Sequence, residues 1–394
     1  MSESPSPLRI AMIGHGFMGD AHTQAWVSAP RFFDLPRHPE PRLLVGRRAD
    51  AAAAAAERLG WAESTDDWRA AIQRDDIDLI DIVTPGDSHA EIAIAALEAG
   101  KHVLCEKPLA NTVEEAERMA EAAASAAERG VLAMVGFSYR RVPAVTLAQQ
   151  LVAEGRLGEI REVRAQYLQD WLTDAESPMT WRLDKDRAGS GSLGDIGAHI
   201  IDMAQFVTGQ TLDSVSATLH TFVDERPLMA ESVGLSGTAS DERGQVTVDD
   251  AAWITARLSG GGFGSFEATR FATGRKNALR LEISGSNGAI AFDLERMNEL
   301  EFYDATADSR ELGFRRILVT EPEHPFDGGW WPTGHAIGYE HTFSHQVRDL
   351  VTAIAEGTQP TPSFADGLQV QRVLDAISAS ATDGSRWTAT EARA

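Results

Sequence analysis

The chain has 394 residues, more than one ordinary hydrophobic core accommodates, so we expect two domains. Its hydrophobic fraction of 43% and charged fraction of 24% are typical of a globular protein. The 59 acidic residues outnumber the 36 basic ones, and the formal charge of -23 repels phosphate backbones, so nucleic acid is not an expected partner.

The amino-terminal residues and the cysteine content bear on the compartment. Residues 1–7 are polar and lack the basic and apolar segments of a signal peptide, so we expect a disordered leader. No apolar run approaches the ~18 residues of a membrane span. The single cysteine, Cys105, allows no internal disulfide and requires no oxidising compartment. These features predict a cytoplasmic protein without a membrane partner.

The first motif follows the apolar run Leu8–Gly14 and reads GHGFMG. It has the spacing GxGxxG between a predicted strand and a predicted helix. In this pattern the first glycine permits a tight turn, the second admits a pyrophosphate, and the third lets the helix pack on the strand. The motif predicts dinucleotide binding rather than a structural turn, with the cofactor contacts Gly14, Gly16, Phe17, Met18 and Gly19.

The second strand is expected at Arg42–Val45, after a loop rich in proline and aromatic residues at Pro30–Pro41. A domain that prefers NAD usually ends this strand in an acid that binds the ribose 2′-hydroxyl. Here the strand ends in Gly46, Arg47 and Arg48, and two guanidiniums can bind a 2′-phosphate. The sequence leans slightly to NADP and leaves NAD open. Alternatively, both arginines lie on a solvated helix start.

Helical and strand patterns then alternate, which predicts a doubly wound parallel sheet of the α/β class. The expected helices are Ala51–Leu59, Asp67–Ile72, Ala90–Ala99 and Val113–Glu128, and the expected strands are Leu79–Val83, His102–Cys105 and Val131–Val135.

Two of these strands are followed by short motifs: Thr84-Pro85 follows Leu79–Val83, and Glu106-Lys107-Pro108 follows His102–Cys105. Carboxyl ends of parallel strands face the ligand crevice in such sheets. Lys107, fixed by a following proline, is therefore expected at a ligand rather than in a surface turn. From these strand ends and the next helix we predict cofactor contacts at Thr84, Pro85, His89, Glu106 and Lys107.

The pattern changes near residue 140. After a helix at Ala144–Glu154, strands are expected at Ile160–Gln169, Leu212–Val223, Ala251–Leu258, Phe263–Phe271, Ala278–Ser284 and Ile290–Phe292. Gly-Gly and Asn-Gly turns between them predict a mostly antiparallel sheet in an α+β domain. Ala230–Gln245 is expected to be a mobile loop, and helices Tyr339–Glu356 and Ala365–Ser380 to pack back across the domain junction. We place the domains at residues 1–140 and 141–394.

A helix in this second part carries an acid and a histidine. A flexible run, Gly189–Ser192, precedes an apolar stripe with helical spacing, which predicts a helix. Asp195 and His199 are four residues apart near its first turns and can act together. A carboxylate beside an imidazole suits proton transfer. The alternative is a helix that Asp195 caps and a His199 satisfied in the core.

Taken in order, these motifs resemble the Gfo/Idh/MocA oxidoreductase family over almost the whole chain. The resemblance rests on the glycine motif, Thr84-Pro85, Glu106-Lys107-Pro108, and Asp195 with His199. Within the family, stretches such as Tyr167–Trp171 and Pro362–Gly367 are most similar to bacterial sugar dehydrogenases of the levoglucosan dehydrogenase kind. The chain departs from the family pattern at Gly46, where an acid is usual, and at Gly86, where asparagine often stands.

The resemblance implies a Rossmann domain followed by a mixed domain whose open sheet forms a homo-oligomer, a dimer or tetramer. It also implies oxidation of a secondary ring hydroxyl of a sugar, anhydrosugar, glycoside or inositol with NAD(P). Lys107, Asp195 and His199 would be the catalytic trio. His199 suits the base, Lys107 can donate to the substrate oxygen, and Asp195 orients the hydroxyl or tunes the base.

The substrate pocket is expected around the catalytic helix. Flat aromatic rings suit the apolar face of a sugar, and guanidiniums can donate to hydroxyls. Each of these residues can instead be a core aromatic or a structural ion-pair residue. The candidates are Arg140, Trp171, Trp181, Arg182 and Arg270, with His335 from a Pro/Gly-rich loop.

Three alternatives remain open at the sequence level. The first is an NAD(P)-dependent glycosidase or lyase that oxidises the ring transiently and eliminates a substituent. The second is a zinc site at His341 and His345, which the absence of HExxH disfavours, so we expect no metal. The third is a non-catalytic cofactor sensor. The sequence decides neither the sugar nor the carbon that is oxidised.

Overall fold

The protein is described by a computed structural model that covers residues 6–233, 236–326 and 330–390. Most of the expected leader, residues 1–5, lies outside the described residues, and Ser6 and Pro7 begin a strand. The chain divides into two compact units, residues 1–138 with 338–368 and residues 139–337 with 369–394.

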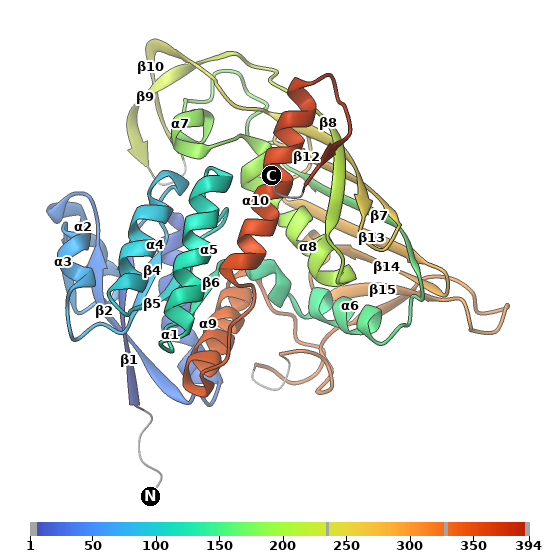
Figure 1. Cartoon of the computed structure of the whole chain (residues 1–394), viewed down its shortest axis with the longest axis horizontal. Coiled ribbons are helices and arrows are strands. Elements are labelled where there is room, and N and C mark those ends of the chain that lie inside the picture. Colours follow the sequence, from blue (N-terminus) through green and yellow to red (C-terminus); the bar gives the residue numbers. More distant parts are fainter. Residues whose placement is uncertain (1–5, 234–235, 327–329, 391–394) are drawn as a thin grey trace, which may run out of the picture. The chain divides into compact units, whose positions relative to one another are not determined.

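The first unit is built on a six-stranded parallel sheet (Figure 1). Its strand order is β3-β2-β1-β4-β5-β6, so the order reverses between β1 and β4. Ligands of doubly wound sheets bind beyond the carboxyl ends of the strands at such a reversal. The predicted α/β class is confirmed, with strands β1 (Ser6–Ile13), β2 (Arg37–Val45), β3 (Glu63–Thr65), β4 (Leu79–Ile82), β5 (His102–Cys105) and β6 (Ala133–Val135).

Helices connect these strands and begin and end where local chemistry allows. Gly60, with φ of 79°, ends α2. At the start of α5, Thr112 accepts from the amide of Glu115 while Glu115 accepts from the amide of Thr112, so this end is closed by a capping box. The helices are α1 (Phe17–Phe32), α2 (Ala49–Leu59), α3 (Trp68–Ile72), α4 (His89–Glu98), α5 (Val113–Ala127) and α9 (Tyr339–Glu356).

The helix α9 completes the core of the first unit although it follows more than 200 residues later in the chain. It packs against α1, and its side chains Phe343, Val347 and Leu350 join Trp26 and Ile10 in one buried cluster. Burial of side chains of this size stabilises a fold by about 1.5–3 kcal/mol each. The first unit therefore depends on a helix that its own amino-terminal sequence does not contain.

The expectation of a loop over Pro30–Pro41 was wrong. Pro30 lies inside the last turn of α1, and β2 begins at Arg37. β3 pairs with β2 only from Leu43 to Val45. Pro39 and Pro41 precede this part of β2, so no N–H donor to β3 is required of them. Proline is tolerated at such an edge.

The second unit contains a nine-stranded, mostly antiparallel sheet in the order β16-β15-β14-β13-β7-β12-β11-β8-β17. Only the pairing of β7 with β12 is parallel within it. The strands are β7 (Ile160–Leu168), β8 (Leu212–His220), β11 (Ala251–Leu258), β12 (Phe263–Thr269), β13 (Ala278–Gly285), β14 (Gly288–Asp293), β15 (Glu299–Asp304), β16 (Arg315–Leu318) and β17 (Thr388–Ala389).

Helices cover one face of this sheet. α8 (Ala198–Thr208) packs on β7 and β13, and α6 (Pro143–Ala153) on β14 and β15. The long helix α10 (Phe364–Thr382) has its first residues in the first unit and the remainder in the second. The opposite face of the sheet presents polar side chains and the partly exposed Trp253 in a hollow of about 790 Å³.

Ala230–Gln245 is not a loop, in contrast to the sequence prediction. β9 (Glu225–Val233) and β10 (Ser236–Gln245) form an antiparallel ribbon, labelled in Figure 1. A two-stranded ribbon need not bury one face, so the alternation of apolar residues that reveals a strand is absent here.

The division into compact units differs from the predicted boundary at residue 140 because residues 338–368 group with the first unit. The assignment of the two predicted domains to separate functions stays a prediction. No helix in the described parts of the chain is long and apolar enough to cross a bilayer.

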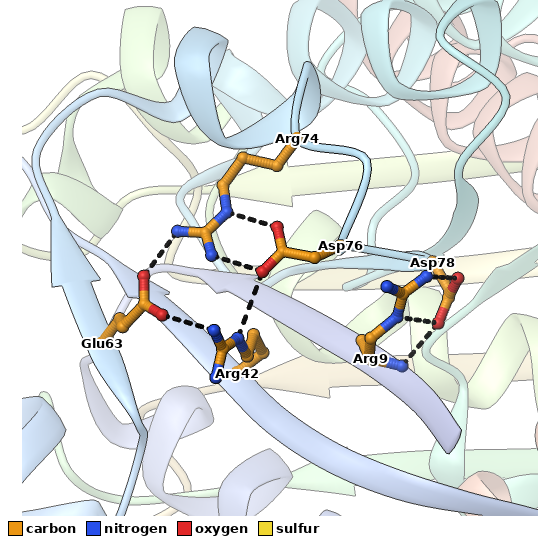
Figure 2. A network of polar contacts seen from close by, with 6 residues as sticks. All are labelled: Arg9, Arg42, Glu63, Arg74, Asp76 and Asp78. Atoms are coloured by element: carbon orange, nitrogen blue, oxygen red, sulfur yellow. Dashed lines mark hydrogen bonds and ion pairs between the residues drawn. The ribbon is translucent and has the colours of Figure 1, made fainter. Parts of the chain in front are cut away.

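A four-residue ion-pair network joins β2, β3 and the segment before β4 (Figure 2). Arg74 bonds Asp76 through Nε and Nη2, at 2.7 and 2.6 Å, and Glu63 through Nη1 at 2.6 Å. Arg42 binds the same two carboxylates. The hydrogen bonds of Arg74 are the main reason that the pKa values of Asp76 and Glu63 lie below their usual range.

A second pair in Figure 2 attaches β1 to the start of β4. Asp78 accepts the Arg9 amide at 2.8 Å, Arg9 Nε at 3.0 Å and Arg9 Nη2 at 2.8 Å. Burial alone would raise the pKa of Asp78, but its bonds to Arg9 and the charges of Arg9 and Arg37 outweigh this effect and lower it. The ionised carboxylate therefore stabilises the central strand pair of the first unit.

We expect Asp78→Asn to lower the free energy of unfolding by about 1–2 kcal/mol at neutral pH, because hydrogen bonds to a charged group are lost. The folded pKa lies below the unfolded value, so this stabilisation is present above about pH 3.9 and is lost as the pH falls through the folded value. Urea unfolding of both proteins at several pH values measures the difference. Asp308→Asn, in an exposed pair with Arg310, is the matched control and should have no measurable effect. An equal loss in both variants would contradict the assignment.

Candidate active site

The glycine motif forms the turn between β1 and α1. Gly14 has φ of 111°, and a Cβ there would lie 2.9 Å from the carbonyl oxygen of Val83, so only glycine fits. At Gly16, the N-cap of α1, a Cβ would meet no heavy atom within 4 Å. The first amides of α1 lack partners within the helix. An open backbone beside a helix amino terminus fits the pyrophosphate of a dinucleotide.

The end of β4 is braced to the segment after β5 by a buried histidine. One ring nitrogen of His89 lies 2.9 Å from the carbonyl oxygen of Thr84, and the other lies 3.0 Å from that of Pro108. Ser88 also donates to the Thr84 hydroxyl at 2.7 Å. His89 was expected at the cofactor. Its ring nitrogens are engaged with main-chain carbonyls, and a cofactor contact stays a prediction.

Gly86 stands where the family pattern often has asparagine, and a neighbouring asparagine fills that space. A Cβ on Gly86 would lie 2.4 Å from Oδ1 of Asn111. The Asn111 carboxamide thus lies beside the Thr84-Pro85 turn, although it comes from the segment after Lys107. The sequence analysis missed Asn111, and no signal in the spacing pointed to it.

The end of β2 also has a substitute side chain. A Cβ at Gly46 would lie 2.6 Å from the imidazole of His15, so this ring occupies the place of an acidic side chain. Arg47 and Arg48 follow and are exposed. Arg48 Nε lies 3.4 Å from Asp50 in a largely exposed pair. The strand end therefore presents positive charge and no carboxylate at residue 46.

In the second unit, a tight turn leads into the segment with the predicted acid and base. Asp249 accepts the amides of Gly191 and Leu193, each at 2.8 Å, and the hydroxyl of Ser192 at 2.7 Å. A Cβ on Gly191 would lie 1.8 Å from the Asp249 carbonyl oxygen, so the close approach requires glycine. Asp249 was missed by the sequence analysis, and its only signal was an acid pair just before a strand.

The predicted helix begins as a π-helical turn. Residues Leu193–Gly197 are π-helical and continue into α8. Asp195 lies in the π turn and His199 in the first turn of α8, so they do not share one regular α-helix as expected. Between residues 191 and 200 these two alone are partly exposed, while the other eight are buried. π-helical turns are frequent at functional sites.

Two arginines face the carboxylate of Asp195. Arg270 is fully buried, and its Nη2 donates to Asp195 Oδ2 and to the Gly191 carbonyl oxygen, both at 2.9 Å. Arg182 Nε lies 3.9 Å from the same Oδ2. Burial lowers the pKa of Arg182; Asp195 opposes this effect and Arg270 adds to it. Arg270 thus restrains the Asp195 carboxyl group through a hydrogen bond, and Arg182 adds a second positive charge nearby.

His199 lies between two tyrosines. Its ring centroid is 4.6 Å from that of Tyr139 and 5.9 Å from that of Tyr167. The two hydroxyl oxygens are 3.0 Å apart, and Tyr167 donates to Asn277 at 2.8 Å. These contacts restrict the orientation of the imidazole. Neither tyrosine was predicted as a site residue, although Tyr167 belongs to a stretch that carried the family resemblance.

The predicted substrate residues fall into two groups. Trp171 is 40% exposed, and its ring centre lies 5.3 Å from the guanidinium carbon of Arg270. The ring centre of Trp181 lies 4.6 Å from the guanidinium carbon of Arg182. These four therefore cluster around Asp195. Arg140 instead forms a buried ion pair with Asp202 of α8. Its role toward a substrate stays a prediction.

The remaining candidates lie in other surroundings. His335 is exposed, with Nδ1 2.7 Å from the Pro332 carbonyl oxygen, and its substrate contact stays a prediction. His341 Nδ1 accepts the Gly338 amide at 3.0 Å, and His345 is buried beside Phe33. Over the described ranges, no three His, Cys, Asp or Glu side chains are grouped to hold a metal ion.

The three residues predicted to be catalytic are thus distributed over both units. Lys107 follows β5 in the first unit, whereas Asp195 and His199 lie in the second. The first unit groups the predicted cofactor contacts at strand ends, and the second groups a carboxylate, an imidazole, two arginines and two tryptophans. The first arrangement fits a nicotinamide dinucleotide, and the second fits proton transfer on a polyhydroxy substrate.

Comparison with known proteins agrees with this arrangement. Residues 8–137 match the oxidoreductase family with an NAD-binding Rossmann fold, and residues 145–291 match the GFO/IDH/MocA C-terminal domain. The chain is 45% identical to levoglucosan dehydrogenase of Pseudarthrobacter phenanthrenivorans over 379 residues, which are 95% of this chain and 96% of the relative.

Solved structures show the same similarity. An oxidoreductase domain protein from Kribbella flavida is 63% identical, with a TM-score of 0.94 over 98% of this chain and all of that one. A levoglucosan dehydrogenase in complex with NADH and levoglucosan is 43% identical, with a TM-score of 0.92 over 98% of this chain and 100% of its own. The resemblance predicted from the motifs is confirmed: the chain is an oxidoreductase of the Gfo/Idh/MocA family.

Proposed function

We propose that the protein oxidises a secondary ring hydroxyl of levoglucosan or a closely related sugar to the ketone. The single observation that carries this proposal is the pair of partly exposed side chains, Asp195 and His199, in an otherwise buried turn. Identity of 45% to a levoglucosan dehydrogenase over 95% of the chain supports the anhydrosugar class.

The proposed chemistry divides the work between the two units. When bound, NAD(P)⁺ supplies the hydride acceptor for the carbinol carbon. His199 takes the hydroxyl proton as the carbonyl forms, since an imidazole is the base best matched to neutral pH. Lys107 donates to the substrate oxygen and stabilises its developing negative charge. Asp195, held by Arg270, accepts from the substrate hydroxyl or tunes the base.

Substrate recognition is assigned to the side chains around Asp195. The faces of Trp171 and Trp181 suit the apolar face of a rigid sugar ring. Arg182 is positioned to donate to hydroxyls. The relatives reported above are dehydrogenases or oxidoreductases by name, so nothing in them supports the glycosidase or lyase alternative.

We also propose a preference for NADP, which rests on the end of β2. Gly46 and the overlying His15 leave no place for the acid that binds a ribose 2′-hydroxyl. Arg47 and Arg48 are exposed and can pair with a 2′-phosphate. The levoglucosan dehydrogenase relative has been solved with NADH, so this chain would differ from it in cofactor choice.

A homo-oligomer, a dimer or tetramer, is proposed through the uncovered face of the nine-stranded sheet. This face carries Trp253, which is 41% exposed, among charged side chains of β7, β12 and β13. A partly apolar hollow on a broad sheet is suited to association with a second copy.

Replacing the proposed base tests the chemistry. We expect His199→Ala to lower kcat by ~10²-fold or more, with cofactor affinity retained, because a general base is lost. Formation of reduced nicotinamide and ketone is measured with levoglucosan, other anhydrosugars, free sugars and inositols. His38→Ala, exposed near the start of β2, is the control and should keep full turnover. Near-native turnover of His199→Ala would contradict the assignment of His199 as the base. Release of an aglycone without net reduction of the nicotinamide would favour the elimination alternative.

Cofactor choice is tested by binding. We expect the wild-type protein to bind NADP⁺ more tightly than NAD⁺, and the double variant Arg47→Ala/Arg48→Ala to lose about tenfold in NADP⁺ affinity, roughly 1.4 kcal/mol. NAD⁺ affinity should stay nearly unchanged, because it has no 2′-phosphate. Isothermal titration measures all four constants, and Arg69→Ala, an exposed arginine of α3, is the control. Tighter NAD⁺ binding by the wild type would refute the preference.

The proposed interface is tested by mass in solution. We expect the wild type to scatter light as a dimer or tetramer and Trp253→Glu to shift toward monomer, because the substitution places a charge in the interface. Leu312→Glu changes an exposed side chain in the loop between β15 and β16 and serves as the matched control. A monomeric wild type, or a Trp253→Glu oligomer as stable as the control, would contradict the proposal.

A further inference from the structure

The first unit contains a cluster of buried ionisable groups that the proposed chemistry does not use. His22 of α1 is 1% exposed, Asp81 of β4 is 0% exposed, and Glu106, directly after β5, is 4% exposed. Charged groups are almost never buried so completely unless they are paired. The cluster therefore has a structural or functional reason to be where it is.

The geometry makes the histidine a bridge between the two acids. Nδ1 of His22 lies 2.9 and 3.0 Å from the two carboxylate oxygens of Asp81, and Nε2 lies 3.0 Å from Oε1 of Glu106. Trp26 donates to Asp81 at 2.7 Å, and the ring of Phe343 covers His22 at 5.5 Å. Ionised carboxylates only accept hydrogen bonds, so a ring that satisfies both acids donates from both nitrogens.

The protonated form is also favoured electrostatically. Burial alone would lower the pKa of His22, but the charge of Asp81 and the hydrogen bonds to both acids raise it from 6.5 to about 10. The imidazolium partly neutralises two buried carboxylates. Without it, two like charges would share a desolvated site with no cation between them.

The bridge ends at the proposed catalytic lysine. The second carboxylate oxygen of Glu106, Oε2, accepts the backbone amide of Lys107 at 3.2 Å. Oε1 is fixed by His22, so the rotation of this carboxylate is restricted at both oxygens. A Cβ on Gly136 would lie 2.7 Å from Oε1, so the neighbouring strand end leaves just enough room for the acid.

We propose that His22 is a positioning residue for Lys107: its imidazolium holds the Glu106 carboxylate, and this carboxylate holds the main chain at Lys107. The inference rests on the proposed function insofar as Lys107 acts on the substrate. A buried ion pair that only stabilises the fold would have the same distances, so the test needs a measurement that stability alone does not change.

The test uses the full-length variant His22→Gln, which keeps a hydrogen-bond donor and removes the charge. We expect faster hydrogen exchange at the Lys107 amide relative to the amides of β1. We also expect kcat to fall by about tenfold relative to the wild type at neutral pH, and this difference to shrink toward pH 10, because the wild-type imidazolium itself loses its proton there. A purely structural lesion would lower kcat by the same factor at every pH.

The matched control is His102→Gln in β5. Burial and the charge of Arg37 lower the pKa of His102 to about 4, so it is neutral, and its ring accepts the Leu132 amide at 3.0 Å. This variant should show neither the local exchange nor the altered pH profile. Glu106→Gln keeps the shape of the acid and should show faster hydrogen exchange at the Lys107 amide. This variant tests the proposal if His22→Gln does not fold.

Stability gives a further readout that does not require a substrate. The folded pKa of His22 lies above its unfolded value, so its stabilisation is complete below about pH 6.5 and is lost as the pH rises through about 10. The urea midpoint of the wild type should fall over this range more steeply than that of His22→Gln.

The outcomes separate this inference from the proposed function. If the wild type oxidises no sugar, the proposed function fails, while exchange at the Lys107 amide still tests the bridge. If folded His22→Gln exchanges Lys107 as slowly as the wild type and its kcat profile runs parallel, His22 does not position Lys107. Local exchange together with the shifted kcat profile, both absent from His102→Gln, would establish it.

Discussion

The candidate site depends on one ion pair, between the buried Arg270 and the partly exposed Asp195. The arginine is fully covered and spans the Gly191 carbonyl oxygen and the Asp195 carboxylate, so it fixes the turn and the acid together. Asp249 closes the same turn from the other side through the Gly191 and Leu193 amides and the Ser192 hydroxyl. The main-chain groups of this turn are thus hydrogen-bonded to charged side chains, which stabilises the close approach of Gly191 to Asp249 in a buried setting. Within residues 191–200, Asp195 and His199 are the two residues that stay partly exposed on this support.

The first unit places local positive charge at its strand ends although the chain as a whole is strongly acidic. The chain carries a formal charge of -23, yet its family binds an anionic dinucleotide. Local groups therefore outweigh the long-range field, which salt screens beyond about 10 Å. Main-chain amides at the start of α1 and the exposed Arg47 and Arg48 supply positive potential at the strand ends. At residue 46, where an acidic side chain is usual, the ring of His15 lies instead.

Sequence patterns predicted the class of both sheets because most strands and helices show a regular pattern of buried residues. The same reasoning failed where no face is buried or where an edge relaxes the rules. The β9–β10 ribbon lacks an apolar alternation, and the prolines of β2 pair with β1 on one side but have no β3 partner on the other. The sequence predicted Lys107, Asp195 and His199 as the chemical groups of the candidate site, and their roles stay proposals. It did not predict the residues that hold these groups in place. Asp249, Tyr139 and Asn111 come from distant positions, and no local spacing marks them.

The sequence by itself determined the family, the cofactor-binding motif and the residue types available for proton transfer. These properties reside in short segments whose spacing carries the information. Tertiary structure decided which of these residues face solvent and which are held by others. It placed Arg140 in an ion pair with Asp202, made the segment before α8 a π-helical turn, and brought His22, Asp81 and Glu106 together. Such contacts join residues up to 84 positions apart, and only the folded chain determines which of them meet.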